Sequence, residues 1–564
     1  MKDLLIKNGF VYDPLNGIDG ERMDIAIQDG KIVQKLGRKK KIIDASGMIV
    51  MPGGVDIHSH IAGAKVNSGR MFRPEDHFKD FEVKTAKTRS GVGYSIPSTF
   101  TTGYRYARMG YTTVMDPAMP PLKARHTHEE LNDTPIIDKA SYPLLNDCWF
   151  VLEPLSKGLI EDCAAYIAWT MEATRGYVIK IVNPGGLEAW GFGRNMRDID
   201  DTVPNFNITP REIIRGLCKV NQLLNMPHAI HVHTNNLGKP GNYVTTLETM
   251  KCVENLANGD KPVMHITHCQ FSSFKGYDWR TFESAAEEIA RYVNTHDHVT
   301  IDTGQVVFGE TTTMTADGPF QYILYQLSHN KWINTDVETE TSTGIVPFKY
   351  KRSSFVNATQ WSIGLELAFL IKDPWKVFMS TDHPNASPFT NYPKIISWLM
   401  SRKARERLFK KINKRAQHKS LLPTLDREYT FSELAIVTRA GPARSLGLKQ
   451  KGHLGLGADA DIAIYNIDPE NIDPAKKHKL IRKAFKNAAY TIKDGQIVVK
   501  NGEIVKSVNG KTYWVKPEVS SSLKEIVPRI KDAFEDYYTV QYENYIVPEH
   551  HLAISNPIPV KAEV

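Results

Sequence analysis

Short apolar runs rich in β-branched residues alternate with helix-forming stretches through the middle of this 564-residue chain. The runs read GYTTVMDP, GYVIKIV, HAIHVHT, PVMHITH, HVTIDTGQVVF and VFMSTDH, and stretches such as TPREIIRGLCKVNQLLN and FESAAEEIARYV lie between them. Such alternation predicts an α/β fold with a parallel sheet, and a TIM-type (β/α)8 barrel suits this length. Because such a barrel carries its chemistry at the carboxyl ends of its strands, we expect the His, Lys and Asp residues of these runs to share one site.

Two strand-rich fragments flank this central region. Residues 1–50 contain strand-like runs separated by Asn-Gly and Asp-Gly turn signals. The same pattern returns near the other end of the chain, in GADADIAIYN and AAYTIKDGQIVVKNGEIVKSV. Turn signals of this kind between alternating runs predict hairpins, so we expect two sheet fragments that bracket the barrel.

Composition and charge exclude several classes of protein. No run approaches the roughly 18 apolar residues of a membrane helix, and 41% hydrophobic with 24% charged residues is typical of a globular chain. The formal net charge is +8, but much of the excess lies in residues 401–419, and no nucleic-acid-binding motif accompanies it. Within that segment Leu408 and Ile412 stand four apart, which favours a solvated helix beside the barrel, with docking on an acidic partner or cofactor as the alternative.

The cysteines and the start of the chain indicate a cytoplasmic protein. The five cysteines are odd in number and lack any Cys-x-x-Cys spacing: Cys148, Cys163, Cys218, Cys252 and Cys269. We therefore predict neither a disulfide framework nor a cysteine zinc site. The start, MKDLLIKNGFVYDP, shows neither the apolar region nor the cleavage site of an export signal.

The segment MPGGVDIHSH, from Met51 to His60, is the strongest single signal for a metal site. Side chains two residues apart on a strand point to one face, so His58 and His60 are expected side by side. Two neutral imidazoles at that spacing suit a cation such as zinc. Two hydrogen-bonded core histidines are the alternative.

Lys180, in GYVIKIVNPGG, is a lysine within an apolar strand-like run, and burial of its charge is costly. Addition of carbon dioxide to the neutral amine would give a carbamate able to bridge two metals. Two divalent metals carry +4, and a carbamate, one aspartate and a bridging hydroxide leave about +1. A lysine that extends its charge to solvent or forms a salt bridge is the alternative.

Further runs end in candidate ligands. These are His228, His231 and His233 in HAIHVHTNN, His265 and His268 in PVMHITHCQF, and Asp382 and His383 in VFMSTDHPN. Only one member of each of the pairs His231/His233 and His265/His268 is needed as a ligand, and a core role for the other is equally plausible. Asp382, where a strand gives way to a loop, suits a metal-bound carboxylate that also takes a proton from the bridging water. A second His-x-His, His126 and His128, lacks a preceding strand and is expected in a loop.

Taken together, these motifs resemble the amidohydrolase superfamily, with His-x-His on the first strand, a carboxylated lysine on the fourth, histidines on the fifth and sixth and aspartate on the eighth. The runs IDASGMIVMPGGVDIHSH and KGHLGLGADADIAIYN are similar to its two-part β-sandwich. The resemblance implies a β-sandwich from residues 1–50 and 441–508, a barrel over 51–440 and an extension over 509–564. More narrowly, DPAMPPLKARHTHEE, HVHTNNLGKPGNY, THCQF, NATQWSIGLELA and STDHPNASPFTNYP resemble the A subunits of formylmethanofuran dehydrogenases.

The resemblance implies a metal site with two divalent ions, for which zinc is the expected metal. Its ligands would be His58, His60, Lys180 as N6-carboxylysine, His231, His268 and Asp382, with Asp382 also catalytic. His233, His265, Asn235 and His383 would lie beside the metals or the substrate. His268 is chosen because Thr267-His268 resembles the Ser-His at the end of the sixth strand in acyl-amino-acid deacylases, whereas His231 over His233 stays open.

The resemblance also implies a reaction and its partners. The enzyme would condense formate with the amine of methanofuran, or hydrolyse the product, in methanogenesis from carbon dioxide. A molybdenum or tungsten pterin subunit that makes formate, and iron–sulfur subunits, would belong to the same complex. The alternatives are a cyclic-amide hydrolase of the dihydropyrimidinase or hydantoinase type, a D-aminoacylase-like deacylase, and a non-catalytic scaffold of the same fold.

Overall fold

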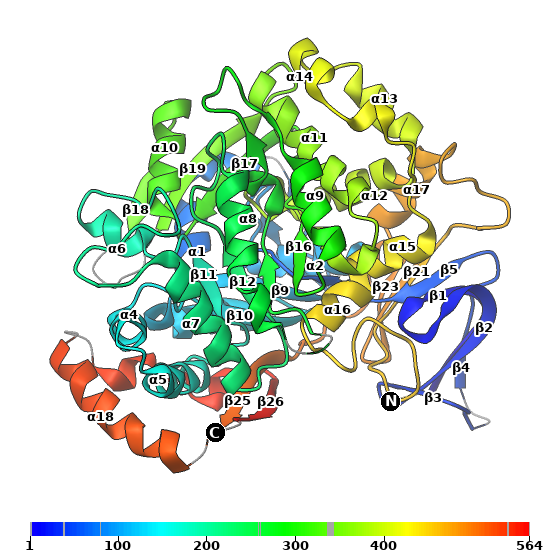
Figure 1. Ribbon diagram of the computed structural model, residues 1–564. Helices are drawn as coiled ribbons and strands as arrows, with labels where there is room; N and C mark the ends of the chain where they lie inside the picture. Colours follow the sequence, from blue (N-terminus) through cyan, green and yellow to red (C-terminus); the bar gives the residue numbers. More distant parts are fainter. Residues whose placement is uncertain are drawn as a thin grey trace.

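The computed structural model places parallel strands at the centre of the molecule, with helices around them and a separate sheet at one side (Figure 1). It describes residues 3–37, 40–78, 80–257, 259, 261–335, 343–519, 521–537 and 541–562. The predicted α/β fold with parallel strands is confirmed. Among the described helices, none combines the length and apolar composition that crossing a membrane requires.

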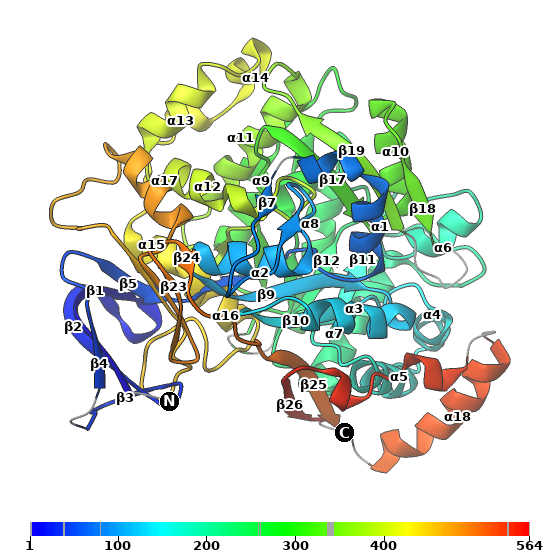
Figure 2. The same cartoon turned by 180° about the vertical axis from the view of Figure 1, so that it is seen from behind.

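The sheet at the side of the molecule joins strands from both ends of the chain. Its strands are β1 (Asp3–Asp13), β2 (Ile18–Gln28), β3 (Lys31–Val33), β4 (Lys40–Asp44), β5 (Ile49–Pro52), β21 (Ile462–Tyr465), β22 (Tyr490–Lys493), β23 (Gln496–Lys500) and β24 (Glu503–Ile504). β5 and β21 pair antiparallel, with Val50 opposite Ile464, and this pairing joins the two ends. Figures 1 and 2 show the blue N-terminal strands beside the orange ones. Buried aliphatic side chains such as Ile6 and Ile462 give this sheet a core of its own.

The central strands form two sheets, and within each sheet these neighbouring strands run parallel. They are β6 (Gly54–Asp56), β9 (Tyr111–Met119) and β10 (Asp138–Pro143) in one, and β11 (Lys180–Val182), β12 (Ile230–His233), β13 (Met264–Ile266), β16 (Val299–Asp302) and β20 (Val377–Phe378) in the other. Two isolated parallel bridges join them, Ser59 with His383 and Leu144 with Lys180. The carboxyl ends of these strands therefore lie on the same side of the molecule.

Helices cover the central strands. Examples are α2 (Thr99–Arg108), α5 (Ile160–Ala173), α7 (Pro210–Leu223), α9 (Ala286–Thr295) and α11 (Phe355–Leu370). α7 begins where the sequence TPRE forms a capping box, in which Thr209 and Glu212 each accept a backbone N–H of the other. Its buried face includes Ile213, Leu217 and Val220, at the spacing of one helical face.

An insertion between β16 and β20 packs beside the carboxyl ends of the strands. It contains β17 (Gly309–Thr315), α10 (Gly318–Ser328), β18 (Ile333–Thr335) and β19 (Thr343–Tyr350). β17 and β19 pair antiparallel along their length. The backbone N–H of Met314 donates to Oδ1 of Asn385 at 2.6 Å, and Thr311 donates to the carbonyl of Pro384. The insertion is thus held against the loop that follows β20.

The end of the chain extends the first parallel sheet. β25 (Thr512–Glu518) pairs with β10 and with β26 (Ser555–Lys561), and α18 (Ser521–Tyr537) packs on α5. Where this extension meets the other sheets, Nζ of Lys451 contacts the carboxylates of Asp138, Asp459 and Asp461. Lys493 contacts Asp138 at 3.1 Å. This buried charge cluster joins segments that are far apart in the sequence.

The basic segment differs from its prediction. In place of one helix over residues 401–419, the structure has α13 (Arg402–Phe409) and α14 (Lys414–Lys419). Asn413 begins the second helix, because its side chain accepts the backbone N–H of Arg415 at 2.9 Å. Ile412 is buried between the two helices, as expected for the apolar face of the segment.

The cysteines behave as predicted. All five lie in the described part of the chain, and none forms a disulfide. Four of them are buried, and Cys148 is partly exposed. Covalent cross-links therefore play no part in holding the described elements together.

Candidate active site

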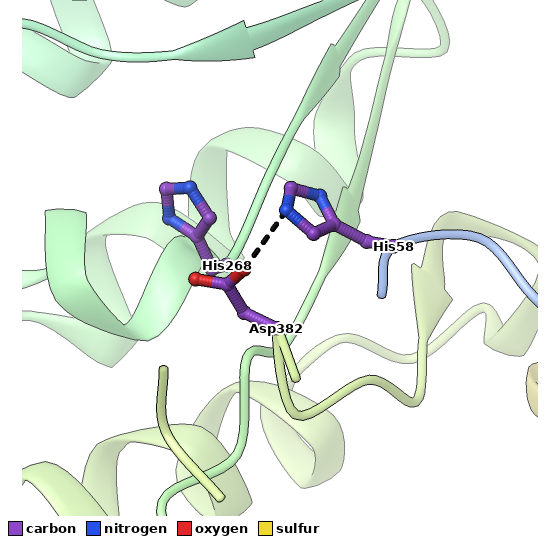
Figure 3. Close-up of side chains that lie close together, drawn as sticks. All are labelled: His58, His268 and Asp382. Carbon is purple, nitrogen blue, oxygen red and sulfur yellow. Dashed lines mark ion pairs between the residues drawn. The ribbon is translucent and has the colours of Figure 1, made fainter. Parts of the chain in front are cut away.

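The loops that follow β6 and β20 bring two predicted imidazoles to one carboxylate. Nε2 of His58 and Nε2 of His60 lie 2.9 Å and 3.2 Å from Oδ1 of Asp382. The backbone N–H of His60 donates to the carbonyl of His383 at 2.7 Å, which joins the two loops. One ligand atom each of His58, His268 and Asp382 lies within 4.8 Å of the others (Figure 3). Because all of these side chains are buried, they form an enclosed polar site.

Lys180, His231 and His265 lie side by side across the neighbouring strands. Lys180 is opposite His231 in the pairing of β11 with β12, and His231 is opposite His265 in the pairing of β12 with β13. Nζ of Lys180 donates to Oγ1 of Thr267 at 3.1 Å, and this hydroxyl lies 3.1 Å from Nε2 of His268. Thr267 therefore connects the lysine to the loop that carries His268.

The two histidines at the end of β12 have different partners. Nε2 of His233 lies 3.1 Å from Oδ2 of Asp317, the residue that caps α10. For His231, neither ring nitrogen finds a hydrogen-bond partner in the part of the chain that the structure describes. A buried imidazole without a polar partner is costly, so the ring of His231 is placed to receive a ligand from outside the chain.

The next pair of histidines shows the same contrast. Nδ1 of His265 lies 2.9 Å from Oγ1 of Thr300, and its Nε2 lies 3.1 Å from Oδ2 of Asp302. Both nitrogens of His265 are thus occupied. His268 bonds Thr267 through Nε2, whereas its Nδ1 has no hydrogen-bond partner within the described residues.

The backbone at His268 and Asp382 is left-handed, with φ of 39° and 46°. Residues other than glycine adopt this region at an energetic cost, and such strain concentrates at functional sites. Gly304 makes room for the turn at His268, because a Cβ at that position would lie 2.5 Å from Cβ of His268. The close packing of these loops therefore fixes where both side chains point.

Burial controls the charge state of the clustered imidazoles. It lowers the pKa of His58, His60, His231 and His268 well below the usual range of histidine, and neighbouring lysines and histidines add to the effect. These side chains are therefore neutral at neutral pH, which is the form of imidazole that binds metals.

Burial also lowers the pKa of Lys180 to about 7, although Asp302 and Asp382 oppose the shift. The amine thus has a large neutral fraction at neutral pH. A neutral amine is the form that reacts with carbon dioxide, so Lys180 is in the state that carbamate formation requires.

Three polar residues outside the predicted set join the site. Asp302 ends β16 and contacts His265 and, at 3.8 Å, Nδ1 of His58. Asn385 donates through Nδ2 to Oδ1 of Asp382 at 2.9 Å, and Asp317 contacts His233. Asp302 shows the strand-end signal that singled out Asp382, so the sequence could have found it. Asp317 lies in the insertion, and its contact with His233 arises only from the packing of distant segments.

The remaining predicted residues lie at the edge of the cluster. Nδ2 of Asn235 donates to Oδ1 of Asn183 and to the carbonyl of Pro184, both at 2.9 Å. Nδ1 of His383 accepts the backbone N–H of Phe389 at 3.2 Å. His228 lies at the start of β12, where Nε2 bonds the carbonyl of Tyr177, on the side of the strands away from Asp382.

The predicted loop position of His126 and His128 was wrong. Both lie on α3 (Ala124–Asn132). His128 is buried, and its Nε2 bonds the carbonyl of Thr174 at 2.8 Å, so its role is structural. His126 lies 3.9 Å from Glu130 on the more exposed side of the helix.

The donor set suits a borderline-soft divalent ion. Neutral imidazoles, a carboxylate and a lysine that can become a carboxylate are ligands typical of zinc and similar metals. The His58 ring lies close to Asp382 without the alignment of a hydrogen bond, and Nδ1 of His268 and both nitrogens of His231 are unpartnered among the described residues. A metal ion would take one nitrogen of an unpartnered ring, and His58, His268 and Asp382 are the residues whose ligand atoms lie within 4.8 Å of one another.

Comparison with known proteins identifies the family. Residues 41–499 match the amidohydrolase family. The chain belongs to this family. It is 55% identical over 557 residues to protein FwdA of Methanocaldococcus jannaschii, covering 97% of each chain. It is 34% identical over 557 residues to the A subunit of the formyltransferase/hydrolase complex Fhc of Methylorubrum extorquens, covering 96% of each.

A solved relative extends the comparison of this amidohydrolase to three dimensions. The X-ray structure of the FhcABCD complex from Methylorubrum extorquens, with methylofuran bound, contains a chain with a TM-score of 0.89 and 33% identity. The match covers 99% of each chain. The resemblance predicted from the sequence is confirmed over the whole length, including the extension after residue 508.

Proposed function

We propose that this amidohydrolase is the A subunit of a formylmethanofuran dehydrogenase. It makes or hydrolyses the formyl amide between formate and the amine of methanofuran. The observation that carries the proposal is the match to a chain of a formyltransferase/hydrolase complex with methylofuran bound, over 99% of both chains. The match runs from end to end, so it includes the segments that form the site in this chain.

Two divalent metals, with zinc as the expected ion, would be held by six residues. These are His58, His60, Lys180 as N6-carboxylysine, His231, His268 and Asp382. The free nitrogens of His231 and His268 support their choice over His233 and His265, which are engaged by Asp317 and by Thr300 and Asp302. The lowered pKa of Lys180 supports its carboxylation.

The reaction needs a polarised formyl oxygen and an activated water. Bound metals would supply both, because they act as Lewis acids on the oxygen and lower the pKa of bound water from 15.7 toward about 7. Asp382 takes a proton from the attacking water while the oxygen of that water bonds to the formyl carbon. The same carboxyl group gives that proton to the amine nitrogen as the C–N bond breaks, which leaves formate and the free amine. Condensation is the reverse, and the burial of the site favours it by excluding water.

The other predicted residues would support this chemistry from the sides. His265 is fixed by Thr300 and Asp302, and His233 by Asp317, so both rings would be held in place beside the metal ligands. Asn235 and His383 are anchored in the loops after β12 and β20, where a substrate would enter.

We further propose that the parallel strands close into a (β/α)8 barrel over residues 51–440. The two bridges, Ser59 with His383 and Leu144 with Lys180, support closure because they join the end of β6 to the end of β20 and the end of β10 to β11. The sheet of β1 to β5 and β21 to β24, with its separate core, supports a β-sandwich domain from residues 1–50 and 441–508. Residues 509–564 would then be an extension packed on the barrel.

Condensation requires a supply of formate, which the chain does not itself produce. Its five cysteines lack the spacing that binds an iron–sulfur cluster. We therefore propose that a molybdenum or tungsten pterin subunit delivers formate and that iron–sulfur subunits complete the assembly. The relative of known structure is itself part of a complex with several subunits.

Formyl hydrolysis tests the proposal directly. The purified chain, loaded with zinc, is expected to release formate from formylmethanofuran and to leave hydantoin and dihydrouracil intact. Ring opening of the cyclic amides, without formate release, would instead favour the cyclic-amide hydrolase alternative. Absence of both activities from a metal-replete protein would favour a scaffold.

A further inference from the structure

One side chain ties Asp382 to the insertion between β16 and β20. Asn385 donates through Nδ2 to Oδ1 of Asp382 at 2.9 Å and accepts the backbone N–H of Met314 through Oδ1 at 2.6 Å. Its carbonyl accepts the hydroxyl of Tyr350 at 3.2 Å. Met314 lies on β17 and Tyr350 ends β19, so Asn385 connects the candidate proton carrier to both strands of the hairpin.

The orientation of the amide is fixed by chemistry. A backbone N–H can only donate, so the atom of Asn385 that faces Met314 is the oxygen. An ionised carboxylate can only accept, so the atom that faces Asp382 is the nitrogen. The two ends of the side chain therefore match two partners that a flipped amide would repel. Asn385 is 4% exposed, so water does not readily replace either bond.

The oxygen that Asn385 holds is the one that faces the imidazoles. Oδ1 of Asp382 lies 2.9 Å from Nε2 of His58 and 3.2 Å from Nε2 of His60. The backbone N–H of Asn385 also donates a hydrogen bond to the carbonyl of Asp382 at 2.6 Å. This bond closes a short loop that sets the distance between the two side chains. The donor from Asn385 thus limits rotation of the carboxylate about its last bond.

We propose that Asn385 is a positioning residue, which orients the Asp382 carboxylate for metal binding and proton transfer and makes that orientation depend on β17 of the inserted hairpin. The proposal rests on the proposed function for the role of Asp382, but its orienting contact is independent of the substrate. In amidohydrolase chemistry the carboxylate has to present one oxygen to the ions and keep a defined path to the leaving amine. A hydrogen bond from a rigidly held amide fixes the carboxylate in one orientation, and this orientation meets both requirements.

The variant Asn385→Asp separates this role from a structural one. Aspartate has nearly the same shape and still accepts the N–H of Met314, so the hairpin contact is kept. It loses the donor and faces Asp382 with a like charge. We expect kcat for formylmethanofuran hydrolysis to fall about 10- to 100-fold, with KM little changed, because supporting partners of metal ligands are worth that much. In the Co²⁺-substituted protein the visible absorption spectrum is expected to change.

Two further variants complete the test. Tyr350→Phe removes a bond to the backbone of Asn385 and keeps the amide, so it is expected to retain the wild-type kcat and Co²⁺ spectrum. Asn385→Ala removes both side-chain bonds and is expected to match Asn385→Asp in kcat and to lower the melting temperature as well. If Asn385→Asp does not fold, the kcat and spectrum of Asn385→Ala decide.

Wild-type kcat and an unchanged Co²⁺ spectrum in Asn385→Asp would overturn the proposal, because only the structural contact with Met314 would then matter. Failure of the proposed function has a different result. In that case the wild-type protein releases no formate, and the spectra of the Co²⁺-substituted variants still report whether Asn385 orients Asp382.

Discussion

Asp302 accepts a hydrogen bond from His265, with 3.1 Å between Oδ2 and Nε2, and both side chains are fully buried. The same oxygen lies 3.8 Å from Nδ1 of His58, in the loop that follows β6. Burial alone would raise the pKa of Asp302, but the bond from His265 and the surrounding histidines keep it below the usual range. A permanent negative charge thus stands beside the His58 ring, where it favours the binding of that imidazole to a cation.

Replacement of Asp302 by Asn is expected to weaken metal binding. The change keeps the shape of the side chain and removes the charge behind His58 and His265. Carboxylates that support metal-binding histidines contribute about 10- to 100-fold to metal affinity. Competition with a chelator, followed by metal analysis, measures the change. Asp297→Asn, at an aspartate on the surface, is the control, and equal affinities in the two variants would contradict the prediction.

Lys180→Ala is expected to retain at most one metal ion per chain, compared with about two in the wild-type protein. Without the bridging carbamate, two divalent ions would repel each other with less compensating charge. Metal analysis gives the stoichiometry. Mass measurement of the wild-type protein under non-acidic conditions should show one added carbon dioxide, and full metal content in Lys180→Ala would exclude the carbamate.

Asp382→Asn separates proton transfer from metal binding. Asparagine keeps an oxygen for the metal but cannot act as a base. We expect metal occupancy to fall modestly, while turnover falls by roughly 10² to 10⁴, the usual effect of losing a general acid or base. Metal content and formylmethanofuran hydrolysis are measured on the same sample. Near-normal turnover in a metal-replete sample would move the proton path to His233 or His265.

The charge cluster around Asp138 predicts a dependence of stability on pH. Burial would raise the pKa of Asp138, but Lys451 and Lys493 outweigh it and lower the pKa to about 2. An aspartate with a lowered pKa stabilises the fold above its unfolded value of about 3.9, and this contribution is lost as the pH falls from there toward 2. Stability measured by denaturant unfolding should therefore decline over that range.

Asp138→Asn tests the cluster at neutral pH. It leaves buried ammonium groups with fewer partners, so we expect the free energy of unfolding to fall by about 3 to 5 kcal/mol. The decline between about pH 4 and pH 2 should also become shallower, since the group that titrates there is gone. Lys511→Ala, at the less buried edge of the cluster, is expected to cost less. An unchanged slope in Asp138→Asn would show that other carboxyl groups cause the decline.

Much of the fold followed from local patterns. Alternating apolar runs and helical stretches predicted the parallel strands, and turn signals predicted the strands at each end of the chain. That the two ends combine was implied by the family resemblance, and they do form one sheet. The expected single helix over residues 401–419 and the loop at His126 were wrong. Asn413 caps a second helix in the basic segment, and His126 and His128 lie on α3. Capping and packing decided both, because the composition of these segments permits several local structures.

The sequence by itself determined which residues stand at the ends of the strands, because a strand places its polar terminus where the chain leaves the core. His58, His60 and Asp382 follow from that rule, whereas Lys180 was singled out by its charge within an apolar run. Only the tertiary structure decided which imidazole nitrogens are free. The partners that occupy His233 and His265 are Asp317, Thr300 and Asp302, which come from segments far along the chain. Spacing within a strand fixes the direction of a side chain, but its hydrogen bonds depend on what the rest of the fold brings against it.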